Sequence, residues 1–207
     1  MIEQLFALML LILFSPILAI AATCIALESG FPIVFRQVRV GRHGRPFHLL
    51  KLRSMRPSRA GCRITAGGDP RVTRVGRILR KYKLDELPQL WNIVRGEMSF
   101  IGPRPELPAF VDMQNPTWIQ ILRSKPGITD LSTLVYRDEE SVLAGHEDTE
   151  RVYREQVLPA KLALSTQYLR RRCFRTDCKL LLLTAKYSFL PAGFDPDRIL
   201  RSLVEEG

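Results

Sequence analysis

The sequence predicts a mostly helical α/β protein that is attached to a membrane by its N-terminal segment. Three observations lead to this fold class. An uncharged apolar run extends from Leu5 to Leu27 and is broken near its centre by Ser15-Pro16. A stretch of alternating apolar and polar residues around Gly41 to Gly44 has the pattern of a short β-hairpin. The remainder carries helix-start signals at intervals along amphipathic segments.

The composition bounds the size of the protein and the charge of its partners. The chain has 207 residues, which suits one domain with an attached segment, and 46% of them are hydrophobic, enough for a core. It holds 31 Lys and Arg against 21 Asp and Glu, a formal net charge of +10. Such an excess favours an anionic partner: a nucleic acid, a phosphate-bearing small molecule or an anionic membrane surface. Charge alone does not choose among the three.

Cysteine and histidine usage argues against two kinds of site. The chain shows no C-x-x-C pair and no histidine at zinc spacing. We interpret its cysteines as reduced structural thiols; they are Cys24, Cys62, Cys173 and Cys178. The three histidines are scattered along the chain, so neither a zinc site nor a Ser-His-Asp triad is expected.

The apolar run has the length of a membrane segment, because at about 1.5 Å rise per residue it can cross a hydrocarbon core of about 30 Å. A cleaved signal peptide would need a basic region ahead of the run, where Glu3 is the charged residue. Thr23 is a poor residue before a lipoprotein cysteine at Cys24. A simple spanning helix is possible, and the arginine-rich sequence after it would keep the remainder of the chain cytoplasmic.

Ser15-Pro16 allows a second interpretation of the same run. Pro16 cannot donate a hydrogen bond to the carbonyl of Ile12, and the Ser15 hydroxyl can satisfy backbone groups that the break frees. Two half-helices of about eleven residues, each roughly 16 Å long, could enter one leaflet and return, with both ends on the cytoplasmic side. Because spanning helices also kink at proline, the residues alone leave a kinked span and a re-entrant hairpin open.

A basic region follows the membrane segment. The stretch "FRQVRVGRHGRPFHLLKLRSM" is predicted to form a β-hairpin close to the membrane, with its turn at Gly41 to Gly44. A solvated cationic face attracted to anionic headgroups accounts for most of its arginines. Nucleic-acid binding is the rival, but it normally interleaves aromatic residues or adds a docking helix. The arginines of the region are Arg36, Arg39, Arg42, Arg45, Arg53, Arg56, Arg59, Arg63, Arg71, Arg74, Arg77 and Arg80.

Helices are predicted over most of the rest of the chain. "GRILRKYK" has the pattern of a short helix with Arg80 near its end, and Asn115-Pro116 supplies the cap and first-turn proline of another. A longer helix is expected to run through Leu169. "TDCKLLLLTAKYSFL" suits a buried or interfacial helix better than a second span. Asp195-Pro196 is predicted to start a final short amphipathic helix.

The stretch "KLDELPQLWNIVRGEMSFIGPRP", Lys83 to Pro105, combines an acidic pair with a proline-framed arginine. Asp85 is a favoured N-cap residue, and Glu86 suits a first helical turn. Pro88 is tolerated there because early amides lack an intrahelical partner. On local pattern alone, the stretch predicts a helix that starts with Asp85 as its N-cap.

Several ordered motifs resemble those of the bacterial monotopic phosphoglycosyl transferases, sugar transferases that act on polyprenyl phosphate. They are the apolar segment with "SP", then "VFRQVRVGRHGRPFHLLKLRSM", "DPRVTRVGRILRKYKLDELPQLWNIVRGEMSFIGPRP" and "KPGITDL", within about Leu5 to Leu190. One such motif is weak evidence, whereas the ordered set is specific. With this resemblance we predict a re-entrant hairpin over residues 1–30. A cytoplasmic, membrane-associated catalytic domain with a short β-hairpin and amphipathic interfacial helices follows over residues 31–207, at the bacterial inner membrane.

The resemblance implies a reaction in two steps. A UDP-sugar binds with Mg²⁺, Asp85 attacks the sugar-bearing phosphorus, and the departure of UMP leaves a covalent phosphosugar on the enzyme. Undecaprenyl phosphate then takes the phosphosugar, which initiates glycoconjugate or polysaccharide synthesis. The residues suit this chemistry, because a carboxylate is a competent nucleophile toward phosphorus and Mg²⁺ prefers carboxylate and diphosphate oxygens. Asp85 is therefore also the expected metal ligand.

The resemblance also suggests roles for the neighbours of Asp85. Arg80 and Arg104 match positions that would hold phosphate by bidentate donation, and Lys51 matches a basic position near the same site. Glu86 is left between two roles, metal binding and base catalysis. One departure is Asp130, which stands where the family commonly has glycine and puts the role of the "PGITDL" loop in question.

Membrane lipids are the other expected partners, and nucleic acid is not expected. The transferred sugar is left open, and so is the oligomeric state, a homo-oligomer included. Longer members carry N-terminal extensions, so the expectation here is a minimal catalytic unit. Two rival hypotheses are a membrane-tethered basic binding module without catalysis and a scaffolding member of the same fold with a silent site. Magnesium-dependent release of UMP would separate the enzyme from both.

Overall fold

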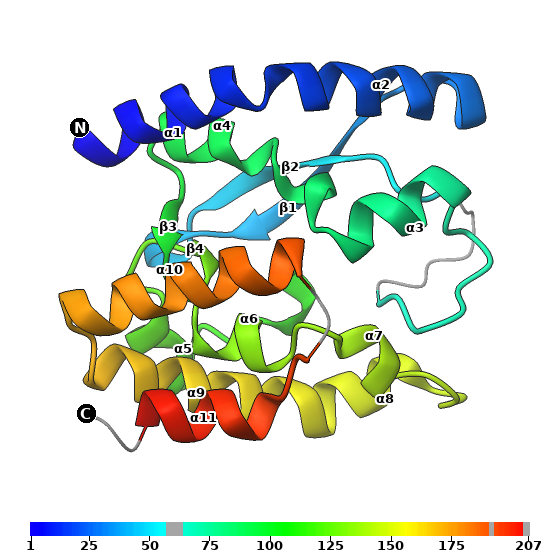
Figure 1. Ribbon diagram of the computed structural model, residues 1–207. Helices are drawn as coiled ribbons and strands as arrows, with labels where there is room; N and C mark the ends of the chain where they lie inside the picture. Colours follow the sequence, from blue (N-terminus) through cyan, green and yellow to red (C-terminus); the bar gives the residue numbers. More distant parts are fainter. Residues whose placement is uncertain (57–63, 191–192, 205–207) are drawn as a thin grey trace.

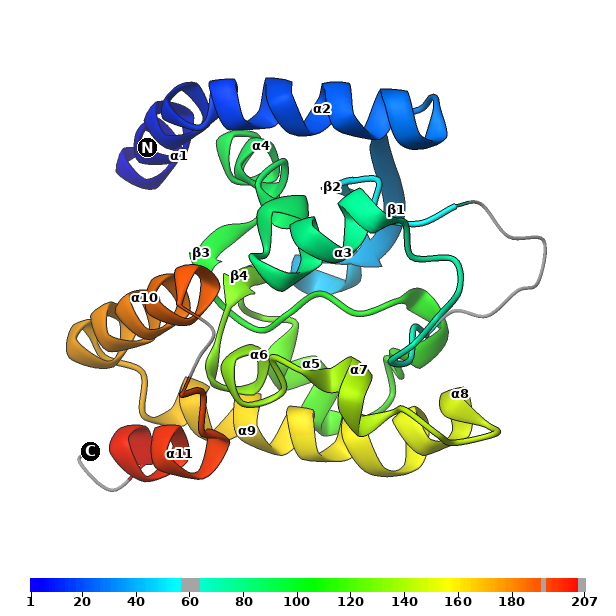
Figure 2. The ribbon, with the colours of Figure 1, turned by 45° about the vertical axis from the view of Figure 1, so that its right-hand side comes forward.

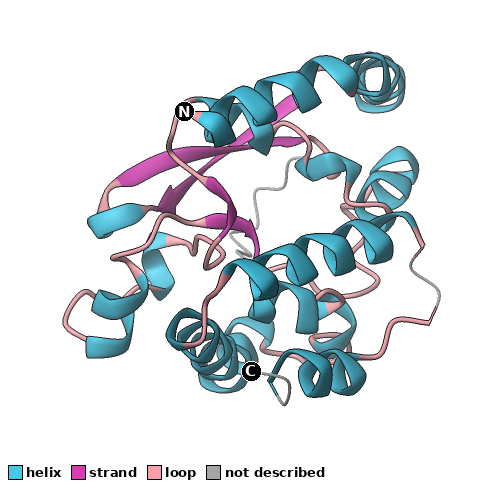
Figure 3. Cartoon of the chain, turned by 60° about the vertical axis from the view of Figure 1, so that its left-hand side comes forward, coloured by secondary structure: helices cyan, strands magenta, loops and turns pink. Residues whose placement is uncertain are grey.

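The fold is a mostly helical α/β arrangement around two small sheets, as the sequence predicts (Figures 1 and 3). The structure is a computed structural model and describes residues 1–56, 64–190 and 193–204. Helices α1 and α2 run along one side of the molecule, α9 and α11 lie on the opposite side, and the strands lie between them (Figures 1 and 2). The interpretations of Arg59, Cys62 and Arg63 fall outside the described residues.

The elements follow one another in this order. The first half contains α1 (Ile2–Leu13), α2 (Ser15–Ser29), β1 (Val34–Val40), the 3₁₀ turn η1 (Arg42–Gly44), β2 (Pro46–Leu52), α3 (Arg74–Lys81), the 3₁₀ turn η2 (Leu84–Glu86), α4 (Gln89–Val94) and β3 (Ser99–Ile101). The second half contains η3 (Pro108–Phe110), α5 (Pro116–Ile121), β4 (Gly127–Thr129), α6 (Leu131–Val135), α7 (Glu139–Val142), α8 (Thr149–Val152), the π-helical turn η4 (Tyr153–Val157), α9 (Leu158–Arg170), α10 (Phe174–Phe189) and α11 (Pro196–Val204).

The apolar run breaks where the sequence predicts it. Helix α1 ends before Phe14, and α2 begins at Ser15 with Pro16 in its first turn. The Ser15 hydroxyl donates to the carbonyl of Ile12 at 2.7 Å, and a backbone amide at the end of α1 also bonds to this carbonyl in place of the i→i−4 donor that Pro16 lacks. The two helices are bent by 57°. Within the described residues no single helix has the length and apolar character of a membrane span, although this bent pair together does.

One face of the α1–α2 pair packs on the rest of the protein. Ala7 is buried against residues of β2 and α4, and Ile25 is buried against residues of β2 and α3. The proposed domain boundary near residue 30 stays a prediction. The other face of the pair is apolar and exposed, and its large side chains are Ile2, Leu5, Phe6, Leu8, Met9, Ile12, Leu13, Ile17, Ile20 and Leu27.

Two carboxylates anchor the ends of the α1–α2 pair. The Glu3 carboxylate accepts a hydrogen bond from the amide of Phe100 at 2.7 Å. At the other end Glu28 accepts from the amides of Arg74 and Val75, at 2.7 and 2.9 Å, and so caps the first turn of α3. The pair is thereby connected to α3, which precedes Asp85-Glu86 in the chain, and to β3, which follows them.

The predicted hairpin is confirmed. Strands β1 and β2 are antiparallel, with Val34 opposite Leu52 and Val40 opposite Pro46. The turn between them covers Gly41 to Gly44, as predicted. Figure 3 shows both strands passing beneath the N-terminal helices.

A second sheet, which the sequence did not predict, consists of two short parallel strands. Ser99 of β3 pairs with Gly127 of β4, and Ile101 pairs with Thr129. The chains approach so closely after β3 that a Cβ at Gly127 would lie 2.1 Å from the amide nitrogen of Gly102. This contact holds the start of the "GPRP" loop against β4.

Helix boundaries in the second half agree with the sequence. The side chain of Asn115 accepts from the amide of Thr117 at 2.9 Å and caps α5, and Asp195 caps α11 in the same way. Helix α9 ends at Arg170, close to the predicted Leu169.

Helix α10 has one buried face and one exposed apolar face. Leu180 and Tyr187 are buried, whereas Phe174 and Leu182 are 85% and 72% exposed. This combination is what a buried or interfacial helix requires.

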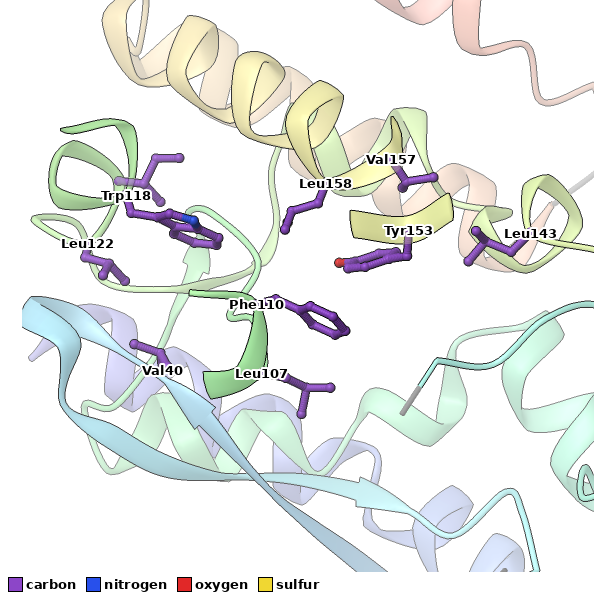
Figure 4. Packing of buried hydrophobic residues seen from close by; sticks show 10 residues of the cluster. Val40, Leu107, Phe110, Trp118, Leu122, Leu143, Tyr153, Val157 and Leu158 are labelled. Carbon is purple, nitrogen blue, oxygen red and sulfur yellow. The ribbon is translucent and has the colours of Figure 1, made fainter. Parts of the chain in front are cut away.

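A core cluster joins the hairpin to the helices of the second half (Figure 4). The aromatic rings of Phe110 and Tyr153 lie 5.0 Å apart at its centre. Its buried members are Val40, Leu107, Phe110, Trp118, Ile121, Leu122, Leu143, Tyr153, Val157 and Leu158. The cluster fixes the loop after β3 between β1 and η4, which is the loop that carries Arg104.

Candidate active site

The residues that the sequence analysis selected for chemistry line one cleft of about 1920 Å³. They come from β2, the end of α3, η2 and the loop after β3, and they are Lys51, Arg80, Asp85, Glu86 and Arg104. The cleft also reaches Leu10 and Phe14, at the break between α1 and α2. A polar site and the bend of the apolar helices therefore share one cavity.

Glu86 is bound by two cations. Lys51 Nζ lies 2.9 Å from Oε1, and Arg104 donates to Oε1 at 2.5 Å and to Oε2 at 3.4 Å. Burial by itself would raise the pKa of Glu86, but Arg104 and Lys51 outweigh it and hold this pKa well below its ordinary value. A carboxylate in this state is a weak base. Its contacts hold Lys51 and Arg104 in place, and a role of Glu86 in metal binding or base catalysis stays a prediction.

Asp85 lies beside this clamp and is only 7% exposed. Its Oδ1 atom is buried and has no hydrogen-bond partner among the residues that the structure describes; we term this atom the open oxygen. Burial raises the pKa of Asp85 and Glu86 adds to the effect, whereas the cations Lys51, Lys83 and Arg80 oppose it. A buried carboxylate without a partner is costly, and such groups concentrate at functional sites.

The prediction that Asp85 is an N-cap is wrong. An N-cap side chain accepts from the amides two or three residues later. Pro88 has no amide hydrogen, and the amide of Leu87 bonds to the carbonyl of Leu84 at 3.3 Å. Asp85 therefore lies inside the turn η2, and α4 begins only after Pro88. The same proline that suggested a helix start removes the donor that Asp85 would cap.

Asn92 fixes α4 against the hairpin. It is completely buried, its Oδ1 accepts from the amide of Leu50 at 3.1 Å, and its Nδ2 donates to the carbonyl of His48 at 2.8 Å. These bonds set the neighbouring Lys51 opposite Glu86.

Arg80 lines the cleft, but its guanidinium forms an ion pair with Glu140 of α7. Burial lowers the pKa of Arg80, while Asp85 acts to raise it. A phosphate bound by Arg80 would share this guanidinium with Glu140. The predicted bidentate phosphate contact stays a prediction.

The loop that carries Arg104 is fixed on both sides. The carbonyl of Pro103 accepts from the amide of Gly127 at 3.0 Å, and the carbonyl of Pro105 accepts from Arg39 at 3.1 Å. With the two prolines restricting φ, these bonds hold the backbone of Arg104 on the wall of the cleft.

The next residue begins a second buried ionic cluster. Glu106 Oε1 accepts from the Tyr153 hydroxyl at 2.7 Å and from Lys161 at 3.0 Å, and its Oε2 lies 3.6 Å from Arg39. Lys161 also lies 2.9 Å from Glu139. We term Arg39, Glu106, Tyr153 and Lys161 the scaffold cluster.

Sequence reasoning missed Lys83 and the scaffold cluster. Lys83 lines the cleft, and its place two residues before Asp85 in the sequence could have identified it as a site residue. Arg39 was interpreted as part of a headgroup-facing surface, but its side chain is only 18% exposed and is bonded to the loop after β3. Lys161 lies far along the chain from Glu106, and no local pattern connects the two.

Asp130 is not among the residues that line the described cleft. It is completely buried, and its Oδ1 accepts from the amide of Thr133 at 2.7 Å, so it caps α6. Its Oδ2 accepts from the hydroxyl of Ser165 at 2.5 Å. The acidic residue in place of glycine is thus explained by a helix cap.

In the described part of the chain, no group of three or more His, Cys, Asp or Glu side chains is arranged to hold a metal ion. Mg²⁺ is commonly bound by one or two carboxylates together with substrate phosphates, so it does not need such a group. The open oxygen of Asp85 fits this mode of binding. Asp85 as a magnesium ligand stays a prediction.

A carboxylate dyad among cations, in a cleft that reaches a bent apolar helix pair, defines a class of site suited to phosphate-bearing substrates at a membrane. The bacterial sugar transferase family matches residues 1–190. The chain belongs to this family, which confirms the resemblance found in its motifs.

Three relatives illustrate the relationship. A UDP-glucose:undecaprenyl-phosphate glucose-1-phosphate transferase of Caulobacter vibrioides is 39% identical over 183 residues, 86% of this chain and 64% of the relative. A transferase with the same description in Escherichia coli (strain K12) is 32% identical over 89% of this chain and 38% of its own length. The sugar transferase EpsL of Bacillus subtilis (strain 168) is 32% identical over 90% of this chain and 85% of its own length.

The chain spans only part of several relatives. For four of the curated relatives it matches, the matched share of the relative lies between 30% and 64%. The matched region nevertheless covers 86% of this chain in the Caulobacter protein, and the family match over residues 1–190 takes in the cleft and the helix break.

Proposed function

We propose that this protein transfers a sugar-1-phosphate from a UDP-sugar to undecaprenyl phosphate and so initiates glycoconjugate or polysaccharide synthesis. The descriptions of the Caulobacter and Escherichia relatives support both substrate classes. One observation carries the proposal. The open oxygen of Asp85 lies beside a clamp of Lys51, Glu86 and Arg104, in a cleft that reaches the bend of the apolar helices.

Asp85 is the nucleophile of the first step. Its carboxylate oxygen bonds to the sugar-bearing phosphorus, the bond from this phosphorus to the bridging oxygen breaks, and UMP leaves with the electron pair. In the second step a phosphate oxygen of undecaprenyl phosphate bonds to the same phosphorus, and the carboxylate of Asp85 leaves. The products are UMP, a polyprenyl-diphosphate-sugar and the regenerated carboxylate.

The cations of the cleft stabilise the charge that moves in both steps. Because Glu86 holds Lys51 and Arg104, little reorganisation is needed when a diphosphate binds. Arg104 can offer a planar fork to phosphate oxygens, whereas Lys51 offers a point charge. Asp85 would hold Mg²⁺ together with the substrate phosphates, and bound Mg²⁺ would neutralise charge on the leaving UMP.

The proposed location is the cytoplasmic face of the bacterial inner membrane, with α1 and α2 as a re-entrant, monotopic anchor. The exposed apolar face of the pair and the bend at Ser15-Pro16 support this placement. Phe14 at the break lines the cleft, so the phosphate of a lipid acceptor would have a short path to Asp85.

Cysteine labelling tests the topology. In a variant without native cysteines, single cysteines at Ile2→Cys and Arg42→Cys should both react with an impermeant reagent only from the cytoplasmic side. Labelling of position 2 from the periplasm would establish a spanning helix. Pro16→Leu restores the missing backbone donor and is expected to move position 2 toward the periplasm, with loss of activity.

Release of UMP tests the activity. The purified protein in nanodiscs is incubated with a panel of UDP-sugars and undecaprenyl phosphate, and UMP is measured with Mg²⁺ or with EDTA. At least one UDP-sugar should yield UMP and a lipid-linked sugar in a magnesium-dependent way. Absence of UMP with every donor, from protein that still binds UDP, would support a binding or scaffolding role instead.

A further inference from the structure

Lys83 adopts a backbone conformation that disfavours side chains. It follows Tyr82, the C-cap of α3, with φ 57° and ψ 20°, and its amide bonds to the carbonyl of Arg80 at 3.1 Å. This left-handed position after a helix is the one that glycine or asparagine usually occupies. Strained residues of this kind cluster at functional sites, which makes the Lys83 side chain a candidate for a role of its own.

The Lys83 ammonium also differs from the other cations of the site. Lys51 and Arg104 bind Glu86, and Arg80 binds Glu140. In the described residues no carboxylate lies within ion-pair distance of Lys83 Nζ, which donates to the carbonyl of Arg137 at 3.4 Å.

The location of Lys83 indicates which anion it meets. Its side chain lines the cleft two residues from Asp85. The carbonyl of Arg137 belongs to the segment between α6 and α7, across the molecule from α1 and α2 (Figures 1 and 2). A water-soluble nucleotide donor would reach the cleft from the side away from α1 and α2, whereas a lipid acceptor would reach it beside these two helices.

We propose that the Lys83 ammonium binds the diphosphate of the nucleotide-sugar donor, as a substrate ligand in addition to Arg104 and Lys51. The proposal rests on the proposed function. Nonbridging phosphate oxygens supply the anionic partner that Lys83 Nζ lacks and take the place of the weak bond to the Arg137 carbonyl. Binding of the donor by this charge accounts for a lysine at a backbone position suited to glycine.

Three substitutions separate the charge of Lys83 from its backbone. Lys83→Asn removes the charge but tolerates the left-handed conformation, Lys83→Gly relieves the backbone, and Lys83→Arg keeps the charge. Arg123→Gln is the matched control, because Arg123 is exposed, carries the same charge and does not line the described cleft. Each protein is compared in nanodiscs by UDP affinity, by the KM for the UDP-sugar and for undecaprenyl phosphate, and by Tm.

The charge-removing variants should bind UDP at least about tenfold more weakly and raise the donor KM by a similar factor, since hydrogen bonds to charged groups are strong. Their Tm should equal or exceed that of the wild type, and the acceptor KM should be unchanged. Lys83→Arg should stay within about threefold of the wild type in UDP affinity, and Arg123→Gln should match the wild type.

Two results would overturn the proposal. One is unchanged UDP affinity in Lys83→Asn while the wild type turns over. The other is an effect confined to the KM for undecaprenyl phosphate, which would assign Lys83 to the acceptor. Failure of the proposed function is a separate outcome, because the wild type would then release no UMP from any UDP-sugar.

Discussion

Two buried ionic clusters lie next to each other in this protein, and they differ in how their charges are matched. In the scaffold cluster both oxygens of Glu106 have cationic or hydroxyl partners, and Lys161 contacts Glu106 and Glu139. Around Asp85 and Glu86, by contrast, the open oxygen of Asp85 has no hydrogen-bond partner among the described residues. The scaffold cluster is internally satisfied, whereas the active-site cluster, formed by Lys51, Asp85, Glu86 and Arg104, retains an oxygen that is free to contact a substrate.

The two clusters also differ in what they do for the structure. Arg39 of the scaffold cluster binds the carbonyl of Pro105, next to Arg104 of the active-site cluster. A matched cluster is rigid because breaking it leaves a buried charge without a partner. The scaffold cluster therefore holds the backbone next to Arg104, on the wall of the cleft that contains the open oxygen of Asp85. Substitutions in the two clusters should consequently act on different quantities.

The largest expected effect is on activity. Asp85→Asn should lower kcat by about a thousandfold or more, because the amide is not a nucleophile. Its free energy of unfolding should stay within about 1 kcal/mol of the wild type, since the buried carboxylate already lacks a full set of partners. Turnover and urea denaturation of the same preparation measure both. Retained kcat with lowered stability would assign Asp85 to the scaffold instead.

The next effect is on stability. Lys161→Met keeps a similar volume but leaves Glu106 and Glu139 without their shared cation, which should cost about 3–5 kcal/mol in the free energy of unfolding. The matched control is the double substitution Glu106→Gln with Lys161→Met, which should recover part of the loss. If the two substitutions are simply additive, Lys161 and Glu106 are not coupled.

Acid should weaken the scaffold cluster in a defined pH range. Burial tends to raise the pKa of Glu106, but Lys161 and Arg39 outweigh it and the pKa lies below its ordinary value of 4.5. The contribution of Glu106 to stability is therefore complete above about pH 4.5 and is lost as the pH falls through the lower, folded-state pKa. The surrounding groups are Arg39, Glu139, Tyr153 and Lys161.

The Tm of the wild type and of Glu106→Gln, measured from pH 7 to pH 3, tests this range. The wild type should be the more stable above about pH 4.5, and the difference should shrink below that value. A difference that does not change with pH would mean that Glu106 contributes through shape and not through its charge.

The smallest effect compares two arginines. Arg104→Lys loses the planar fork that contacts both oxygens of Glu86 and should lower kcat/KM by at least about tenfold, or about 1.4 kcal/mol. Arg42→Lys should change little, because Arg42 is exposed and the charge is kept. Equal liposome binding by both variants is the control. Equally mild losses of activity would place Arg104 with the surface cations.

The sequence predicted the features whose causes are local. Ser15-Pro16 predicted the helix break because proline has no backbone N–H to donate. The expected hydrogen bond from the Ser15 hydroxyl to the carbonyl of Ile12 is present. The alternation of apolar and polar residues around Gly41 predicted the hairpin, and Asn115 predicted the start of α5. The five residues that the family resemblance singled out for chemistry lie in one cleft.

The features that the sequence did not predict depend on contacts between distant segments. Strands β3 and β4 are three residues each, too short to show a period, and Gly102 approaches Gly127 from another part of the chain. Glu106 and Lys161 meet only after folding. Asp85 was misassigned as an N-cap because cap preference was considered without asking which amide would donate.

The central claim is that Asp85 carries the phosphosugar, and trapping tests it most directly. The protein is incubated with its UDP-sugar and no undecaprenyl phosphate, digested with trypsin, and analysed by mass spectrometry with fragmentation. The account predicts one added phosphosugar on peptide 84–95, located on Asp85, released by hydroxylamine and absent from Asp85→Asn. UMP that forms only when the acceptor is present, with peptide 84–95 unmodified throughout, would contradict it and indicate direct transfer between the two substrates.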